Sequence, residues 1–117
     1  GSSGDRVAVV RLLASGDADN SFDGAGMRGD TDSWVDVKGN GWLVQANRGS
    51  LSPQDGFQVH VEAPGWGRGN KIAGNSGELG PGGEYGVRVD KDAAGTVVGC
   101  DNKISGAAKG LSNIPCH

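Results

Sequence analysis

Hydrophobic and polar residues alternate one by one along several short stretches of the chain. In residues 57–62 (FQVHVE), the apolar side chains of Phe57, Val59 and Val61 are separated by polar ones. Residues 84–90 (EYGVRVD) alternate in the same way. A period of two is that of a β-strand, whose successive side chains point to opposite faces. The pattern therefore predicts a strand at both places, each with one apolar and one polar face.

Further stretches have the composition of strands. Residues 34–38 (WVDVK) and 42–46 (WLVQA) are separated by a Gly-Asn-Gly triplet at 39–41, which is typical of a hairpin turn. Residues 96–100 (TVVGC) follow a turn-rich stretch, whereas 6–14 (RVAVVRLLA) suit either a strand or a helix. About six antiparallel strands are expected from these patterns.

The expected fold is all-β: a single small antiparallel β-sandwich or barrel with glycine-rich loops, spanning residues 1–117. Glycine supplies 23 of the 117 residues and gathers between the apolar stretches, as in a domain with many tight turns. Residues 63–83 and 101–115 show no alternation, so we expect long irregular loops there. The first four residues have the composition of an added or processed start.

Arginine recurs at intervals of twenty residues, which raises the question of an internal repeat. The residues around these arginines do not match, although a repeat architecture needs matching apolar positions. We therefore expect no repeat. The arginines concerned are Arg28, Arg48, Arg68 and Arg88.

Composition and charge narrow the functional classes. The formal net charge is −3, so a broad electrostatic contact with nucleic acid is not expected, except with a nucleic acid substrate. No stretch reaches the ~18 apolar residues of a membrane helix. Cys100 and Cys116 do not have the spacing of a zinc or redox motif. We expect them to form a disulfide in a secreted monomer; the alternative is two reduced cysteines in a cytosolic protein.

Residues 19–30 (DNSFDGAGMRGD) resemble the calcium-binding loop of the EF-hand family. Asp19, Ser21, Asp23 and Asp30 stand at loop positions that carry oxygen ligands in that family. The last ligand is Asp rather than Glu, and the following residues have the pattern of a strand instead of a helix. The alternatives are thus a calcium-stabilised β domain and a solvated acidic loop. Calcium is the one cofactor that the sequence suggests.

A second stretch, 101–106 (DNKISG), resembles the calcium loop of microbial βγ-crystallins. Asp101, Asn102 and Ser105 match that loop, whereas its final serine is replaced by Gly106. This resemblance also implies a calcium-stabilised β domain.

His60 and Glu62 lie on the polar face of one predicted strand, and Arg88 lies on the polar face of another. Two proton-transfer groups and a cation are what metal-free phosphodiester cleavage requires. Together with His117, these residues are similar in type to those of small secreted ribonucleases of the T1 type. One alternative function is therefore a secreted ribonuclease-like hydrolase; the other interpretation is a solvated strand with mixed charges.

Trp66 lies in a glycine-rich stretch, residues 64–69 (PGWGRG), together with Arg68 and shortly before Asn70. An indole on such a loop suits contact with a sugar ring or a protein surface, unless it folds back over the open end of the sheet. No motif of a nucleotide-binding or hydrolytic enzyme class is present. We therefore predict a small secreted binding protein of the effector, toxin or inhibitor kind, which recognises a protein or carbohydrate through Trp66, Arg68 and Asn70.

Overall fold

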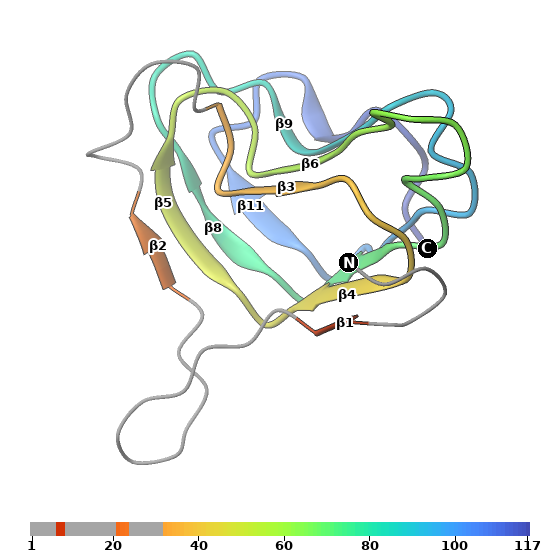
Figure 1. Ribbon diagram of the computed structural model, residues 1–117. Coiled ribbons are helices and arrows are strands. Elements are labelled where there is room, and N and C mark those ends of the chain that lie inside the picture. Colours follow the sequence, from red (N-terminus) through yellow and green to blue (C-terminus); the bar gives the residue numbers. More distant parts are fainter. Residues whose placement is uncertain (1–6, 9–20, 24–31) are drawn as a thin grey trace.

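The computed structural model describes residues 7–8, 21–23 and 32–117, which form short strands in three sheets (Figure 1). The first sheet contains β1 (Val7–Ala8), β4 (Trp42–Gln45), β7 (Lys71–Ala73) and β10 (Val97–Val98). The second sheet contains β2 (Ser21–Asp23), β5 (Arg48–Ser52), β8 (Ser76–Leu79) and β11 (Lys103–Ser105). The third sheet contains β3 (Val35–Val37), β6 (Phe57–Val59), β9 (Tyr85–Val89) and β12 (Gly110–Ser112). Within these described ranges, no helix is long and apolar enough to cross a membrane.

The chain visits the three sheets in turn, and each round forms one coil of a solenoid. Strands β4, β5 and β6 form one coil, and β7, β8 and β9 form the next. Every pairing between neighbouring described strands is parallel. This arrangement is a parallel β-helix. The long connections from β6 to β7 and from β9 to β10 lie together at one corner of it (Figure 1).

The predicted antiparallel sandwich or barrel is wrong, because the strands pair in parallel. Alternation identifies a strand but not its partner, which here lies one full coil away along the chain. The Gly-Asn-Gly triplet at 39–41 is not a hairpin, since it carries the chain from β3 in the third sheet to β4 in the first. Gly41 has a φ of +66° and donates its N–H to the carbonyl oxygen of Arg68 in the next coil. The turn therefore stacks against the following coil.

The two stretches expected to be irregular loops also contain strands. Residues 63–83 include the whole of β7 and β8, and residues 101–115 include β11 and β12. These strands are short and rich in serine, glycine and lysine, so they show no apolar alternation. Each strand contributes one apolar residue to the core or its edge, such as Ile72 of β7 and Leu79 of β8, and pairing with the neighbouring coil maintains it as a strand.

The chain does contain a repeat, contrary to expectation. Asn47, Asn75 and Asn102 occupy equivalent turns between the first and second sheets, and they are 28 and 27 residues apart. The buried aliphatic residues that precede them share one register row, formed by Val44, Ile72 and Val98. The arginine spacing of twenty residues corresponds to no structural period, so treating it as chance was right, whereas excluding a repeat was wrong.

The core is a stack of apolar side chains enclosed by the three sheets. Val44, Ile72 and Val98 of the first sheet are 0% exposed. In the third sheet, the buried residues of β6 lie directly beside those of β9: Phe57 beside Val87 and Val59 beside Val89. Each coil thus buries its apolar residues against those of the coils on either side.

Trp34 fills the core next to the second sheet, where that sheet has glycines in place of side chains. Its ring meets Phe57 edge-on with centroids 5.6 Å apart, and its indole N–H donates to the carbonyl oxygen of Ser50 at 3.0 Å. A Cβ atom on Gly77 would lie 2.7 Å from the Trp34 ring, and one on Gly49 would also overlap it. Glycine at these positions makes room for the indole.

A buried ladder of asparagine side chains connects the turns between the first and second sheets. Asn47 Nδ2 donates to Asn75 Oδ1, and Asn75 Nδ2 donates to Asn102 Oδ1, both at 2.9 Å. The same two oxygens accept the backbone N–H groups of Asn47 and Asn75 at 3.0 Å. Asn102 Nδ2 completes the ladder by donating to the carbonyl oxygens of Ile72 and Gly99. The ladder satisfies most of the buried polar groups at these turns, although Asn47 Oδ1 has no partner among the described residues, and it holds successive coils in one register.

The predicted disulfide between Cys100 and Cys116 is confirmed, with the Cα atoms 5.0 Å apart. His117 donates its backbone N–H to Val98 at 2.8 Å and accepts that of Cys100 at 3.1 Å. The last residues therefore form a further row beside β10, and the disulfide joins this row to the coil before it.

We predict that Asn75→Ala lowers the free energy of unfolding by about 3 kcal/mol or more. The substitution leaves buried groups of two neighbouring coils without partners, at a cost of about 1–3 kcal/mol for each. Urea unfolding followed by circular dichroism measures the change. The control is Gln45→Ala, at an exposed position on β4, which should change stability by no more than about 0.5 kcal/mol. Equal stabilities of the two variants would contradict the role of the ladder.

Candidate functional site

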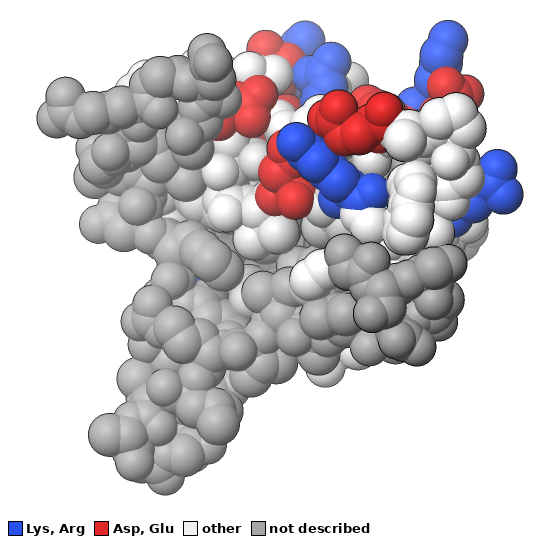
Figure 2. Space-filling model, viewed as in Figure 1, with Lys and Arg blue, Asp and Glu red and all other residues white. Residues whose placement is uncertain are grey.

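Charged residues gather on the outer face of the third sheet, where acidic and basic side chains interleave (Figure 2). The apolar residues of β3, β6 and β9 point into the core. Of the residues between them, Asp36 and Arg88 reach the outer surface, whereas Gln58 is buried. Asp36, Gln58 and Arg88 form one register row across these three strands. We call this surface the third-sheet face, and it includes the charged residues next to the row: Lys38, His60, Glu62, Glu84 and Lys109.

One half of the third-sheet face is a network around Asp36. His60 Nδ1 lies 2.5 Å from Asp36 Oδ1, and both side chains are about one-third exposed. Lys38 Nζ lies 3.8 Å from Asp36 and 3.3 Å from Glu62. A carboxylate at Nδ1 orients the imidazole ring and leaves Nε2 for contact with a ligand or for proton transfer.

The other half of the face is a cluster of cations around Tyr85. Arg88 and Lys109 lie 5.7 and 5.9 Å from the centroid of its ring. Both cations share one carboxylate oxygen of Glu84, at 3.2 and 3.1 Å. The hydrogen bond from Lys109 holds the pKa of Glu84 below its usual value, and the charge of Arg88 adds to this effect. Two cations with one carboxylate leave one unbalanced positive charge beside an aromatic ring.

Gln58 lies between the two halves in the register row, and it is bonded through Asp55 to the half around Tyr85. Its Nε2 donates to Asp55 Oδ2 at 2.9 Å, while Asp55 Oδ1 accepts the backbone N–H of Tyr85 at 3.0 Å. Gln58 is 2% exposed and Asp55 is 0% exposed. These bonds hold β9 and Tyr85 in a defined position relative to β6.

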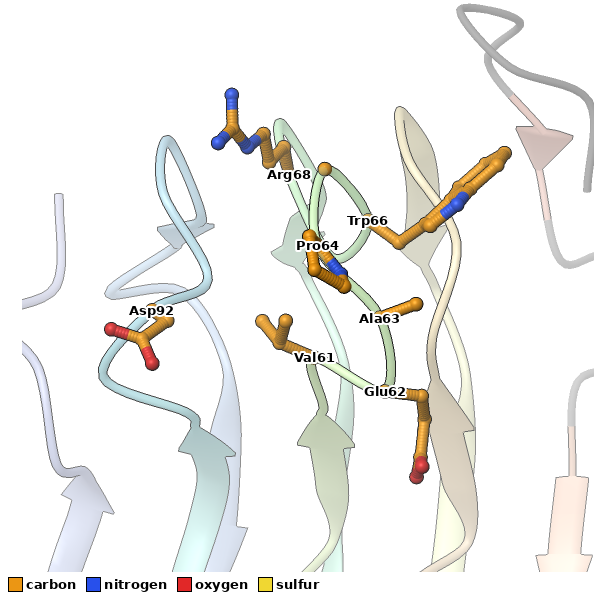
Figure 3. A pocket seen from close by; sticks show the side chains of 8 residues that line it. Val61, Glu62, Ala63, Pro64, Trp66, Arg68 and Asp92 are labelled. Carbon is orange, nitrogen blue, oxygen red and sulfur yellow. The ribbon is translucent and has the colours of Figure 1, made fainter.

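A second candidate site is a pocket of about 340 Å³ at the loop that follows β6 (Figure 3). Trp66 is half-buried and Arg68 is exposed. The two side chains extend to opposite sides of the loop (Figure 3). Asp92, from the loop after β9, lies on the same side as Arg68 (Figure 3). The wall is completed by Val61, Glu62, Ala63, Pro64 and Gly65.

The preceding coil fixes the loop that carries Trp66 and Arg68. Asn40 Nδ2 donates to the carbonyl oxygen of Gly65 at 3.0 Å, and Asn40 Oδ1 accepts the backbone N–H of Arg68 at 2.8 Å. Gly67 has a φ of +81°, and a Cβ atom there would lie 2.8 Å from the carbonyl oxygen of His60. Glycine is therefore required where the loop passes closely over β6.

Asn70, which the sequence placed among the binding residues, has a structural role. Its side chain is 0% exposed. Asn70 Oδ1 accepts the N–H of Trp42 at 2.8 Å, and Nδ2 donates to the carbonyl oxygen of Gly39 at 2.9 Å. Of the three predicted binding residues, the structure places Trp66 and Arg68 together at the pocket, while Asn70 supports the turn before β4.

The proposed hydrolase residues are brought together only in part. His60, Glu62 and Arg88 share the third-sheet face, but Glu62 pairs with Lys38 and Arg88 pairs with Glu84. His117 is exposed and bonds through its backbone to the first sheet, so it belongs to another face of the β-helix. The set of four does not form one site.

The predicted calcium ligands fall largely outside the described residues. Asp19 and Asp30 lie outside them, and only the backbone of Ser21 and Asp23 is described, as part of β2. Within the described ranges, no three His, Cys, Asp or Glu residues come together as a metal site. In the second calcium-like stretch, Asn102 is a buried member of the asparagine ladder, and Asp101 Oδ1 accepts the N–H of Gly74 at 2.9 Å.

Several residues of the third-sheet face were not predicted as site residues. Asp36 could have been found, because it alternates with Val35 and Val37 and so belongs to a polar strand face. Glu84, Tyr85 and Lys109 meet only because successive coils stack, and no local pattern in the sequence indicates that contact.

The comparisons with known proteins give one structural match. An alginate lyase from Paenibacillus sp. str. FPU-7 is similar to this chain with a TM-score of 0.68 and 31% sequence identity. The match covers 80% of this chain and 33% of that lyase, so the chain spans about one-third of the length of the lyase. No protein-family model matches the chain, and no curated protein matches it in sequence. The similarity is to a protein that acts on a carbohydrate.

Proposed function

We propose that this chain is part of a parallel β-helix protein that binds an anionic polysaccharide of the uronate type on the third-sheet face. The observation that carries the proposal is the 31% identity, with a TM-score of 0.68, to an alginate lyase. Alginate is a polymer of uronic acids, so each of its sugars carries a carboxylate. A protein that binds such a polymer needs cations and aromatic rings on one accessible surface.

The third-sheet face has these groups. Arg88 and Lys109 supply one more positive charge than Glu84 balances, and Tyr85 lies within 6 Å of both cations. A guanidinium binds a carboxylate through two parallel hydrogen bonds, which gives geometric specificity as well as affinity. The Arg88 side chain is 43% exposed and Lys109 is 55% exposed, so both reach solvent.

The geometry of the β-helix suits a long ligand. Asp36 and Arg88 are the exposed ends of a row that crosses three strands, with the buried Gln58 between them, and neighbouring strands lie about 4.8 Å apart. A polysaccharide that runs along the stacking direction of the coils would meet the network around Asp36 and the cations around Tyr85 in sequence. Such a chain extends over several coils, as expected of solenoid binding surfaces.

The proposal places the protein outside the cell. Its support is the disulfide between Cys100 and Cys116, since disulfides persist in oxidising compartments. The alternative partner is another protein, and a wild-type chain that does not bind any uronate polymer would favour that alternative.

We predict that Arg88→Ala and Lys109→Ala each weaken binding of a uronate polymer roughly tenfold, and that added salt weakens binding by the wild-type chain. Calorimetry or affinity electrophoresis with alginate measures the effect. Lys103→Ala is the matched control, because Lys103 is an exposed cation on the second sheet. Equal losses in all three variants would indicate non-specific attraction, and unchanged binding by Arg88→Ala and Lys109→Ala would refute this placement of the site.

A second candidate function is β-elimination on the same polymer, and the contact between His60 and Asp36 favours it. In this reaction a base removes the proton from the carbon next to the uronate carboxylate, and the negative charge spreads onto that carboxylate. The electron pair then forms a carbon–carbon double bond as the bond from the neighbouring ring carbon to the glycosidic oxygen breaks, and that oxygen takes up a proton. His60 Nε2 would be the base, oriented by Asp36, while Arg88 would neutralise the carboxylate.

If the chain catalyses elimination, His60→Ala abolishes the reaction and Asp36→Asn lowers its rate by roughly a hundredfold. The increase in ultraviolet absorbance from the unsaturated product measures the rate. His117→Ala, a histidine on another face, should retain full activity. Cleavage that yields only saturated ends would contradict elimination and favour hydrolysis, and activity of His60→Ala equal to wild type would exclude His60 as the base.

A further inference from the structure

The loop between β6 and β7 presents two side chains without partners on a fixed backbone. Among the described residues, the indole N–H of Trp66 has no hydrogen-bond acceptor, whereas that of Trp34 donates to Ser50. The guanidinium of Arg68 likewise forms no ion pair within the described part of the chain, although Arg88 pairs with Glu84. Among the described residues, these two side chains have no polar partner, so the indole N–H and the exposed guanidinium are available to a ligand.

The backbone of this loop is held from both neighbouring coils. Asn40, from the coil before, bonds to Gly65 and to Arg68. Gly69 donates its N–H to the carbonyl oxygen of Ala94, in the loop after β9, at 3.0 Å. Because the loop is fixed at these points, a ligand that binds Trp66 and Arg68 pays little entropy for ordering them.

The pocket adjoins the third-sheet face through a chain of ionic contacts. Glu62 lines the pocket and pairs with Lys38. Lys38 also contacts Asp36, which binds His60. A ligand that occupies the third-sheet face can therefore continue onto the loop without leaving the protein surface.

The positions of the two side chains indicate contact with successive units of a polymer. Trp66 extends toward the side of the earlier coil together with Glu62, and Arg68 extends toward the loop of Asp92 in the later coil (Figure 3). A single sugar between them would have to span the width of the loop. Two neighbouring sugars would place one ring on the indole and the next carboxylate at the guanidinium.

We propose that this loop is an additional subsite for acidic sugars, in which one sugar ring stacks on Trp66 and the carboxylate of the adjacent sugar pairs with Arg68. This inference rests on the proposed function, because it assigns the same polymer to a second surface. An indole offers a large apolar face at a low cost in side-chain entropy, and a guanidinium matches the geometry of a carboxylate. The carboxylates of Glu62 and Asp92 can accept hydrogen bonds from sugar hydroxyls.

The test compares short and long uronate oligosaccharides in a titration followed by calorimetry and tryptophan fluorescence. Wild type should bind the long oligosaccharide more tightly, because it reaches both surfaces. Trp66→Ala and Arg68→Gln should each weaken binding of the long oligosaccharide roughly tenfold and leave binding of the short one unchanged. Trp66→Phe should keep most of the affinity while losing the fluorescence change, since the aromatic face remains.

Matched controls separate this inference from the proposed function. Lys71→Gln removes an exposed cation from the first sheet and should bind both oligosaccharides like wild type. If Arg88→Ala weakens binding but Trp66→Ala and Arg68→Gln do not, binding on the third-sheet face is supported and the subsite at the loop is refuted. If the loop variants weaken binding and Arg88→Ala does not, the subsite at the loop is supported and binding on the third-sheet face is refuted. A neutral oligosaccharide that binds as tightly as the acidic one would refute the role of Arg68. Loop variants that bind both oligosaccharides like wild type but lose binding to a protein would refute the sugar subsite.

Discussion

The hydrogen bonds between Asn47, Asn75 and Asn102 are the constraint on which the remaining structure depends. Each asparagine is 4% exposed or less, and each lies at the turn where the chain passes from the first sheet to the second. A buried amide must have partners, so a coil that slipped by one residue would leave donors and acceptors unsatisfied. The same slip would turn the apolar row of Val44 and its counterparts out of the core. The ladder therefore sets the register of the three successive coils that contain these asparagines.

That register explains which parts of the fold could be predicted from the sequence. The sequence predicts strands with apolar alternation, such as β6 and β9, because the alternation indicates which face is buried. Their partners were not found, because a parallel partner lies about one coil away and leaves no local signal. Strands β8 and β11 consist mainly of polar residues and glycine, and the neighbouring coil rather than their own sequence makes them strands. The repeat could not be predicted because the residues that recur are mainly asparagines, which are typical of surface turns.

The candidate sites also consist of residues that a local sequence pattern identifies and residues that only contacts between coils bring together. Trp66 and Arg68 could be chosen from the sequence, since a glycine-rich loop with an indole and a cation is unusual within a single stretch. The contact of His60 with Asp36, and that of Arg88 and Lys109 with Tyr85, joins residues from different coils. Stacking of coils thus converts scattered charges into rows along the β-helix. The polymer that we propose as the ligand, with a carboxylate on each sugar, would contact several members of such a row, whereas a compact ligand would contact only a few.

We propose that an acidic polysaccharide lies along the third-sheet face and continues onto the loop of Trp66. Nuclear magnetic resonance of the isotope-labelled chain, titrated with a uronate oligosaccharide, locates the bound sugar residue by residue. Shift changes should concentrate at His60, Arg88 and Lys109, and at the indole N–H of Trp66. Arg48 and Lys103, which are exposed cations on the second sheet, should show little change. Shift changes concentrated on the second sheet, or spread evenly over all exposed cations, would show that the polysaccharide does not bind there.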